Sequence, residues 1–316
     1  MGIVVIGAIF VDVKGFPHDL YIPDGRNAGW VEYVHGGVSR NVAEDIANVE
    51  LRPTFVSIVD DTALGKDVVR KLQRHKVNTD YVLTVPGGLG TWLVVFDNCG
   101  DVAGSISQRP NLYPLLNLLE ERGDELIANA DSIVLEADMD KEIVKKVFQL
   151  AEKYQKKIFA VVSNMSIAAE RRDFLQRFDC FVCNQLEAGI FFADDYSDKT
   201  PEQMCDILSE RVVRGQIPAM VVTMGAQGSV YADRNGEKGI CPAKKVQVKD
   251  TTGAGDAFCA GLAIGLTYGK TLRESAEIGT LLSASVITSS ENVCPRFLPR
   301  ELGLDMDVPE SESEND

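Results

Sequence analysis

The sequence predicts an α/β protein with a mainly parallel central sheet between two layers of helices. Two observations support this prediction. Short, β-branched apolar segments alternate with longer segments of helical periodicity along most of the 316 residues. The short segments are apolar nearly throughout, as expected for strands that helices cover on both faces. Strand–helix alternation over this length is typical of parallel strands joined by crossover helices.

The N-terminal run MGIVVIGAIFVDV predicts the first buried strand, with Gly7 and Ala8 allowing close approach of a neighbouring segment. Further buried strands are predicted, in chain order, at 54–59 (TFVSIV), 131–137 (DSIVLEA), 157–163 (KIFAVVS), 180–183 (CFVC) and 218–223 (AMVVTM). Between them, apolar residues recur on one face of 140–154 and of 202–214, which predicts amphipathic helices.

Two segments interrupt the alternation. Residues 12–35 carry Pro17, Pro23 and several aromatic residues without helical periodicity, and residues 88–108 have the pattern of a hairpin, with TWLVVF, the turn DNCG and DVAGSIS. We expect them to form together a small β-sheet lid over one edge of the main sheet. Two unrelated surface excursions would give the same pattern.

Composition and charge limit the classes of partner. Hydrophobic residues make up 45% of the chain, and the 32 basic and 47 acidic residues give a net charge of −15. No basic field is present to attract phosphate backbones or anionic lipids, so nucleic-acid and membrane partners are not expected. Residues 305–316 (DMDVPESESEND) hold six acids and no base, which leaves −9 (−15 + 6) for the rest of the chain. We expect this acidic tail to be disordered and residues 1–304 to form the folded domain.

The cysteines and the N-terminus indicate a cytoplasmic protein. Seven scattered cysteines fit a reducing compartment better than a set of disulfides, and the N-terminal run has neither a basic leader nor a cleavage site of small residues. Cys180 and Cys183 have C-x-x-C spacing, but in a strand an offset of three places the two thiols on opposite faces. We therefore expect buried thiols there and no metal or redox site.

The segment DTTGAGD, residues 250–256, has the composition of an anion-binding loop. Gly253, Ala254 and Gly255 lack bulk, and the apolar run that follows predicts a buried helix, so free backbone N–H groups should converge at a helix N-terminus. Asp256 would lie in the first helical turn, where an aspartate beside a phosphate can take a proton from an attacking hydroxyl. An ordinary helix start with a favourable acid is the alternative. The loop is not a Walker motif, since no G-x-x-x-x-G-K-[ST] occurs in the chain.

The segment HGGVSRN, residues 35–41, precedes a second predicted helix. Two glycines there let the backbone approach a ligand, Ser39 is expected to cap the helix, and Arg40 and Asn41 offer directional donors to sugar hydroxyls. The alternative is a strand-to-helix turn with polar surface residues.

Two more candidates directly follow predicted strands. Asn184 and Glu187 come after CFVC, and Thr223, Gly225 and Gly228 come after AMVVTM. Ligands bind at the carboxyl ends of strands in open α/β sheets, and a carboxylate there can hold Mg²⁺, often through water. A helix cap with a surface acid, and a plain glycine turn, are the alternatives for the two segments.

Taken together and in order, these segments resemble the ribokinase (PfkB) family of carbohydrate kinases. GGVSRN and DTTGAGDAFCAGL are similar to its two signatures, and N-x-x-E at 184–187 and T-x-G-x-x-G at 223–228 to its two intermediate motifs. The resemblance covers residues 1 to about 300. It implies a ribokinase-like three-layer fold with a β-lid, and ATP-dependent phosphorylation of a hydroxymethyl group.

The resemblance also implies a role for each matching residue. Asp256 would be the catalytic base, and the backbone of 253–255 the anion hole. The substrate would be bound by Asp12, Gly36, Gly37, Arg40 and Asn41. The nucleotide would be bound by Asn184, Glu187, Thr223, Gly225 and Gly228. Glu187 would also bind Mg²⁺, through water, and Asp250 and Thr252 would bind K⁺. Residues 288–294 (TSSENVC), where further K⁺ ligands would lie, depart from the usual arginine-containing stretch of the family.

Within the family, GGVSRN, DVKGFP and the hairpin GTWLVVFDNCGDV most resemble pseudouridine kinases. The predicted substrate is therefore pseudouridine, with a free sugar such as fructose, ribose or a 2-keto-3-deoxy sugar acid as the alternative. A ligand-binding relative without activity would be expected to have lost Asp256 or the glycine loop, but both are present. A dehydrogenase would need an early dinucleotide fingerprint, which the sequence does not contain. The apolar hairpin suits a homodimer formed through the lid, although packing against its own domain would explain it too.

Overall fold

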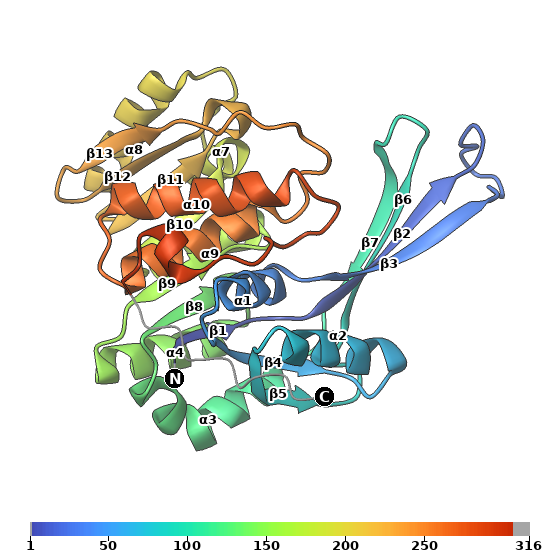
Figure 1. Ribbon diagram of the computed structural model, residues 1–316, viewed down its shortest axis with the longest axis horizontal. Helices are drawn as coiled ribbons and strands as arrows, with labels where there is room; N and C mark the ends of the chain where they lie inside the picture. The colour runs from blue at the N-terminus through green and yellow to red at the C-terminus, as the bar shows by residue number, and fades with distance from the viewer. Residues whose placement is uncertain (1, 306–316) are drawn as a thin grey trace.

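The computed structural model describes residues 2–305 and shows a large sheet, with its strands parallel except one, between two helical layers (Figure 1). In spatial order its nine strands are β13 (Lys238–Cys241), β12 (Ser229–Asp233), β11 (Ala219–Thr223), β10 (Cys180–Asn184), β9 (Ile158–Val161), β8 (Ser132–Glu136), β1 (Ile3–Ile6), β4 (Thr54–Val59) and β5 (Asn78–Thr84). Only β12 runs against its neighbours.

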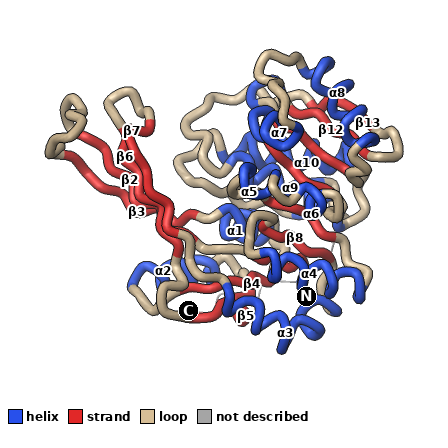
Figure 2. The backbone as a smooth tube through the Cα atoms, turned by 180° about the vertical axis from the view of Figure 1, so that it is seen from behind, coloured by secondary structure: helices blue, strands red, loops and turns tan. Residues whose placement is uncertain are grey.

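Two separate hydrophobic clusters define the helical layers. Along β1, Ile3 and Val5 belong to one cluster, and Val4 and Ile6 belong to the other, so the strand is buried on both faces. The first cluster packs under α1 (Val38–Asn48), α2 (Ala63–Arg74), α9 (Ala254–Thr267) and α10 (Leu272–Val286). The second, on the face seen in Figure 2, packs under α3 (Tyr113–Ala128), α4 (Lys141–Tyr154), α5 (Met165–Ala169), α6 (Arg172–Leu175), α7 (Gln185–Phe192) and α8 (Pro201–Arg214). Two short 3₁₀ helices are Gly225–Gln227 and Pro299–Leu302.

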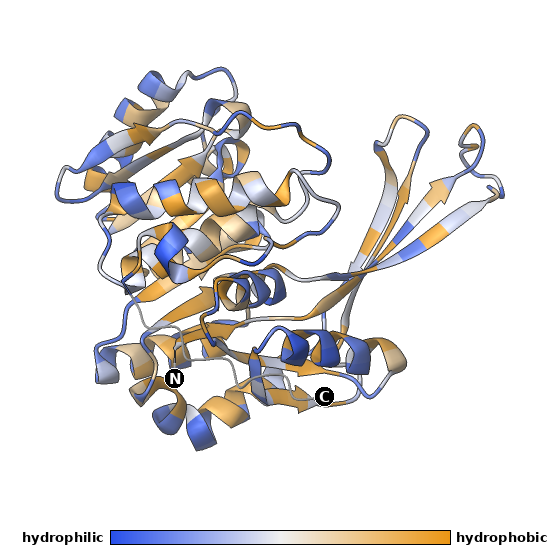
Figure 3. Ribbon diagram, in the orientation of Figure 1, coloured by the Kyte–Doolittle hydropathy of each residue, from blue (hydrophilic) through white to orange (hydrophobic). Residues whose placement is uncertain are grey.

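A separate four-stranded sheet projects from the domain (Figures 1 and 2). Its order is β3 (Gly29–Gly36), β2 (Phe10–Pro17), β6 (Gly90–Phe96) and β7 (Val102–Gln108). The two predicted excursions therefore pair into one lid, and they are not unrelated surface segments. Hydropathy follows this division, with the strands of the main sheet mostly apolar and the lid strands mixed (Figure 3).

The predicted strands from 54 to 223 and both predicted helices are present, with boundaries shifted by a few residues at most. The N-terminal run is not one strand, since it divides into β1 of the main sheet and the start of β2 in the lid. Cys180 and Cys183 are buried, unpaired and assigned to opposite hydrophobic clusters, as expected from strand geometry. The prediction that Ser39 caps α1 is wrong, since the N-cap is Gly37 and Ser39 lies in the first turn. The acidic tail lies outside the described residues, apart from Asp305. No helix in the described part of the chain is long and apolar enough to cross a membrane.

Candidate active site

The structure brings the four predicted segments to one edge of the main sheet. Asn184 and Thr223 are register partners at the carboxyl ends of β10 and β11. The loop at 250–256 leads into α9, which packs on one face of this sheet. Asn41, in α1, donates a hydrogen bond to Asp256 across 215 positions of sequence.

Asp256 lies in the first turn of α9 and has the surroundings of a general base. Asn41 Nδ2 donates to Asp256 Oδ2 at 2.6 Å, and no hydrogen bond reaches the other carboxylate oxygen from any described residue. Burial raises the pKa of Asp256 to about 6, although the bond from Asn41 and the charge of Arg40 act in the opposite direction. A carboxylate with this pKa is ionised at neutral pH and still basic enough to accept a proton from a hydroxyl group.

The glycine loop has the backbone geometry expected of an anion hole. Gly253 is the N-cap of α9 with φ +81°, and a Cβ there would lie 2.0 Å from the carbonyl oxygen of Asn292. Gly255 has nothing within 4 Å of its Cβ position. The N–H groups of a first helical turn have no intrahelical partner. The N–H of Ala254 donates to Thr251 O at 3.2 Å, whereas those of Gly255 and Asp256 have no hydrogen-bond partner among the described residues and are free for an anion.

Gly36, Gly37 and Asp12 lie where the lid joins α1. A Cβ on Gly36 would lie 2.5 Å from Asp12 Oδ1, so only glycine lets the carboxylate approach the backbone here. Gly37 has φ +94°, and a Cβ added there would clash with the carbonyl oxygen of Ala8. Burial raises the pKa of Asp12. The three residues thus place a carboxylate of β2 beside the start of the helix that carries Asn41.

Arg40 does not have the position that its motif implied. Its side chain is fully buried, pairs with Glu44 at 2.5 Å and donates to the carbonyl oxygens of His35 and Gly36. All of its contacts are within the protein, so its guanidinium is not available to a substrate hydroxyl. The prediction that Arg40 binds the substrate is therefore wrong, and what Arg40 contributes is a charge that acts to lower the pKa of Asp256.

Asn184 and Glu187 form a capping box at the start of α7. Asn184 Oδ1 accepts from the N–H of Glu187, and Glu187 Oε2 accepts from the N–H of Asn184, both at 2.8 Å. The alternative interpretation as a helix cap is thus confirmed locally. The second Glu187 oxygen has no hydrogen-bond partner among the described residues, and burial raises the pKa of this carboxyl. The cap fixes the carboxylate and leaves one oxygen available at the sheet edge.

A cavity of about 140 Å³ joins the T-x-G-x-x-G motif to the glycine loop. Thr223, Gly225 and Gly228 line one side of it, and Ala254 and Gly255 line another. Sequence reasoning missed the other lining residues, which come from α9, α10 and the segment after β13: Ala243, Lys244, Phe258, Thr280, Ser283, Ala284 and Ile287. Nothing in the helical pattern of α10 marks it as part of a site.

Gly228 is required by packing, because a Cβ there would lie 2.2 Å from the carbonyl oxygen of Cys241. Gly225 has open space at its Cβ position. The features of Gly225 that favour glycine are therefore its φ of +57° and its position in the wall of the cavity, and not a close contact.

Asp250 and Thr252 form a tight turn before the loop. Thr252 N donates to Asp250 Oδ1 at 2.8 Å. Partial burial alone would raise the pKa of Asp250, but the hydrogen bonds from Thr252 hold it below its usual value. The carboxylate is therefore ionised, as a cation ligand must be.

Glu136 lines a second cavity and belongs to none of the sequence motifs. It ends β8, is buried, and its Oε2 accepts from Ala8 N at 3.0 Å and from Ser39 Oγ at 2.9 Å. Burial, and secondarily the charge of Asp138, raises the pKa of Glu136 to about 7. A cavity of about 260 Å³ opens beside it, lined by Ala8, Phe10, Arg109, Pro110, Leu112, Glu136, Asp138, Met139, Asp140, Ile167 and Arg171.

With this geometry established, comparison with known proteins gives the family. Residues 2–294 match the model of the pfkB family of carbohydrate kinases. This chain belongs to the PfkB family. Its members are phosphotransferases that use ATP and a hydroxyl acceptor, and this protein is a sugar or nucleoside kinase of that family.

Individual PfkB relatives differ in the substrate that their names state. A guanosine-inosine kinase from Exiguobacterium acetylicum is 33% identical over 92% of this chain and 95% of its own length. A pseudouridine kinase from Escherichia coli is 25% identical over 90% of each chain. The fold matches that of Arabidopsis thaliana ribokinase complexed with ribose and ATP, with a TM-score of 0.80, 20% identity and coverage of 96% of this chain and 99% of that one.

Within residues 2–305, no group of three or more His, Cys, Asp or Glu side chains is arranged to hold a metal ion. Mg²⁺ does not need such a group, since it usually keeps several waters and takes one or two carboxylates together with substrate phosphates. The free oxygen of Glu187 fits that donor set.

Proposed function

We propose that this kinase phosphorylates the hydroxymethyl group of a nucleoside, with purine nucleosides such as guanosine and inosine as the first choice. The cavity of about 260 Å³ beside Glu136 is the observation that favours a nucleoside over a free sugar as the substrate. Its wall combines Phe10, Leu112 and Met139 with charged groups, which suits a flat, apolar ring with polar edges. Glu136 accepts from Ser39, which lies two residues before the Asn41 expected at the sugar, so base and sugar sites would adjoin.

The relatives support the same class. The relatives at 33% and 25% identity are named for a purine nucleoside and for pseudouridine. Pseudouridine is the second candidate, because the lid hairpin and GGVSRN resemble pseudouridine kinases and the 25% relative is one.

In the proposed reaction the substrate hydroxyl oxygen attacks the γ-phosphorus of ATP. Asp256 takes the hydroxyl proton, the bond from phosphorus to the bridging oxygen breaks, and ADP leaves with that electron pair. The N–H of Gly255 and the dipole of α9 would stabilise the charge on the transferred group. Asp12, Gly36, Gly37 and Asn41 would hold the substrate.

On the nucleotide side, Thr223, Gly225 and Gly228 would line the ATP site, with Asn184 positioning Glu187. Glu187 would hold Mg²⁺, through water, and the metal would supply charge neutralisation on the phosphates. Asp250 and Thr252 are proposed K⁺ ligands; the ionised, turn-bound carboxylate of Asp250 supports this proposal.

A substrate panel tests the proposal. ADP formation should be measured with guanosine, inosine, pseudouridine, uridine, ribose and fructose at equal concentration. We expect the highest kcat/KM for guanosine or inosine. Turnover of ribose or fructose without turnover of any nucleoside would refute the assignment, and a preference for pseudouridine would favour the second candidate.

We further propose that the lid forms a homodimer. Tyr33 on β3, Leu93 on β6 and Ile106 on β7 lie in one cross-strand row, in which Val13 of β2 separates Tyr33 from Leu93. Their exposed fractions are 61%, 43% and 68%. An apolar row this exposed is typical of a surface that another protein chain covers.

A further inference from the structure

Two buried oxygen atoms in α1 have no hydrogen-bond partner within the described part of the chain. They are Oδ1 of Asn41 and Oδ2 of Asp45. Residues spaced i and i+4 lie on the same face of a helix, one turn apart, so these two side chains are neighbours. A buried polar atom without a partner costs free energy, and two such atoms at this spacing require a physical explanation.

The side-chain amide of Asn41 is bound at one end only. Its Nδ2 donates to Asp256 Oδ2 at 2.6 Å, whereas its Oδ1 is buried and has no donor among the described residues. Because this oxygen is shielded from solvent, its partner has to come from the protein. An amide with one free end can turn over, and turning would place an acceptor where Asp256 now meets a donor.

Asp45 has the surroundings of a carboxyl group that keeps its proton. Its side chain is fully buried and makes no ion pair with any described residue. The nearby cations Arg40 and Lys71 both pair with Glu44 instead. Oδ1 of Asp45 accepts from Cys294 N at 2.6 Å, which leaves Oδ2 as the orphan atom. A buried carboxylate without a cation is far more costly than a neutral carboxyl group.

The groups that face Asp45 favour the same protonation state. Burial raises the pKa of Asp45 well above its usual value, and the charges of Asp256 and Glu44 raise it further, against the hydrogen bonds from Cys294. The thiol of Cys259, on α9, also faces Asp45. None of these groups carries a positive charge, so no cation offsets the effect of burial.

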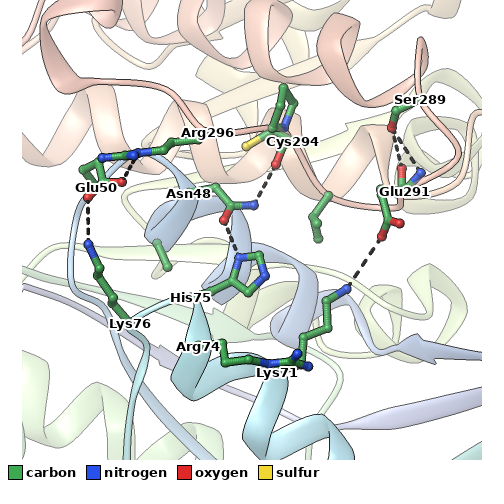
Figure 4. Close-up of a pocket in the computed structure, with 13 residues that line it drawn as sticks. Asn48, Glu50, Lys71, Arg74, His75, Lys76, Ser289, Glu291, Cys294 and Arg296 are labelled. Atoms are coloured by element: carbon green, nitrogen blue, oxygen red, sulfur yellow. Dashed lines mark hydrogen bonds and ion pairs between the residues drawn. The ribbon is translucent and has the colours of Figure 1, made fainter. Parts of the chain in front are cut away.

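Asn48 offers a comparison from the same helix. It donates from Nδ2 to Cys294 O at 2.6 Å, and its Oδ1 lies 2.6 Å from His75 Nδ1, in the pocket shown in Figure 4. Asp45 and Asn48 therefore both hold the backbone of Cys294. Asn48 is seven positions from Asn41, a rise of about 10 Å along the helix, which is beyond the reach of one hydrogen bond.

We propose that Asp45 is a positioning residue for the catalytic base, because its protonated carboxyl group donates from Oδ2 to Oδ1 of Asn41. This bond satisfies both orphan atoms and fixes the amide with Nδ2 toward Asp256. The bond from Asn41 acts to lower the pKa of Asp256, so a fixed amide keeps the base ionised at neutral pH. The effect on catalysis rests on the proposed role of Asp256, whereas the hydrogen bond within α1 does not.

Two substitutions at Asp45 test this positioning role. Asparagine offers an acceptor to Cys294 and a donor to Asn41, as a protonated aspartic acid does, and alanine offers neither. Asn48→Ala is the matched control, because it also removes a hydrogen bond to Cys294. With the best substrate of the panel, kcat/KM should be measured from pH 5 to pH 9.

We expect an acidic limb with its midpoint at about 6, the pKa of Asp256, in wild type, Asp45→Asn and Asn48→Ala. In Asp45→Ala the midpoint should lie about one pH unit higher, because the bond from Asn41 to the base is no longer held. No shift in Asp45→Ala, a shift in Asp45→Asn, or an equal shift in Asn48→Ala would overturn the proposal.

A double-mutant cycle tests whether Asp45 acts through Asn41. In an Asn41→Ala background, Asp45→Ala should produce no further shift of the acidic limb. The same shift in both backgrounds would show that Asp45 acts on Asp256 by another route, and would overturn the proposal.

Denaturant unfolding tests the proton on Asp45 without any turnover. The unfolded chain releases this proton above about pH 4, whereas the folded protein keeps it, so the stability of wild type falls as pH rises. Asp45→Asn has no such proton. Its unfolding equilibrium constant, relative to that of wild type, should therefore fall about tenfold per pH unit from pH 5 to pH 7.

A constant ratio of the two unfolding constants over this range would show that Asp45 is ionised in the folded protein, and would overturn the proposal. If Asp45→Ala does not fold, this measurement and the kinetics of Asp45→Asn still decide the question. Absence of turnover with every substrate of the panel would refute the proposed function and leave the unfolding result interpretable.

Discussion

Substituting Gly253 by Ala should nearly abolish activity while the domain remains folded. The added Cβ would lie 2.0 Å from the carbonyl oxygen of Asn292, and real Cβ atoms essentially never approach other heavy atoms within 3.0 Å. The three atoms nearest to the added Cβ all belong to the backbone of Asn292, and none is a flexible side-chain end. The backbone of 253–256 or of the 292 segment must therefore move by about 1 Å (3.0 − 2.0). The φ of +81° adds about 1–2 kcal/mol of strain for alanine.

A misplacement of about 1 Å at a reacting centre costs about 100-fold in rate. We therefore expect kcat of Gly253→Ala to fall about 100-fold in a coupled ADP-release assay. Gly236→Ala is the control, because Gly236 has a similar φ of +96° but nothing within 4 Å of its Cβ position. It should lose stability in thermal unfolding without losing activity. Retention by Gly253→Ala of kcat within about threefold of wild type would refute the role of this loop geometry.

Three further predictions follow from the site. Asp256 acts as a base only when ionised, and its pKa is raised to about 6. We therefore expect kcat/KM to rise about tenfold from pH 5 to pH 7 and to level off at higher pH. A flat profile over this range would contradict the role of Asp256. Glu187→Gln retains an oxygen for the capping box but removes the charge, and should weaken Mg²⁺-dependent activity about tenfold in a Mg²⁺ titration, whereas Glu202→Gln, in the first turn of α8, should not. Ile106→Asp should convert a dimer to a monomer in sedimentation velocity, while Ser105→Asp, on the other face of β7, should leave the dimer intact. A dimeric Ile106→Asp variant, or a monomeric wild-type protein, would contradict the lid interface.

The sequence predicted the parts of the fold that depend on local periodicity. The strands from TFVSIV to AMVVTM are apolar on both faces, and their burial follows directly from the layers. Asp256 and Asn41 were both identified from loops that open helices, but their hydrogen bond spans 215 positions and only the folded sheet brings them together.

The errors and omissions have physical causes. Arg40 stands in the substrate motif, yet residue type does not show that its side chain points inward to Glu44. Ser39 was expected to be a helix cap, but the positive φ of Gly37 starts the helix earlier and frees Ser39 to bond Glu136. Glu136 itself is one acid at the end of one strand, and its importance comes from burial, which no local pattern encodes.

The most direct test of the central claim is phosphoryl transfer by Asp256→Asn. Asparagine retains the size of the side chain but cannot accept the hydroxyl proton as a carboxylate does. With the best substrate of the panel, we expect kcat to fall by about 10²- to 10⁴-fold, while ATP binding measured by calorimetry stays within about twofold of wild type. Undiminished turnover by Asp256→Asn would contradict the assignment of Asp256 as the catalytic base.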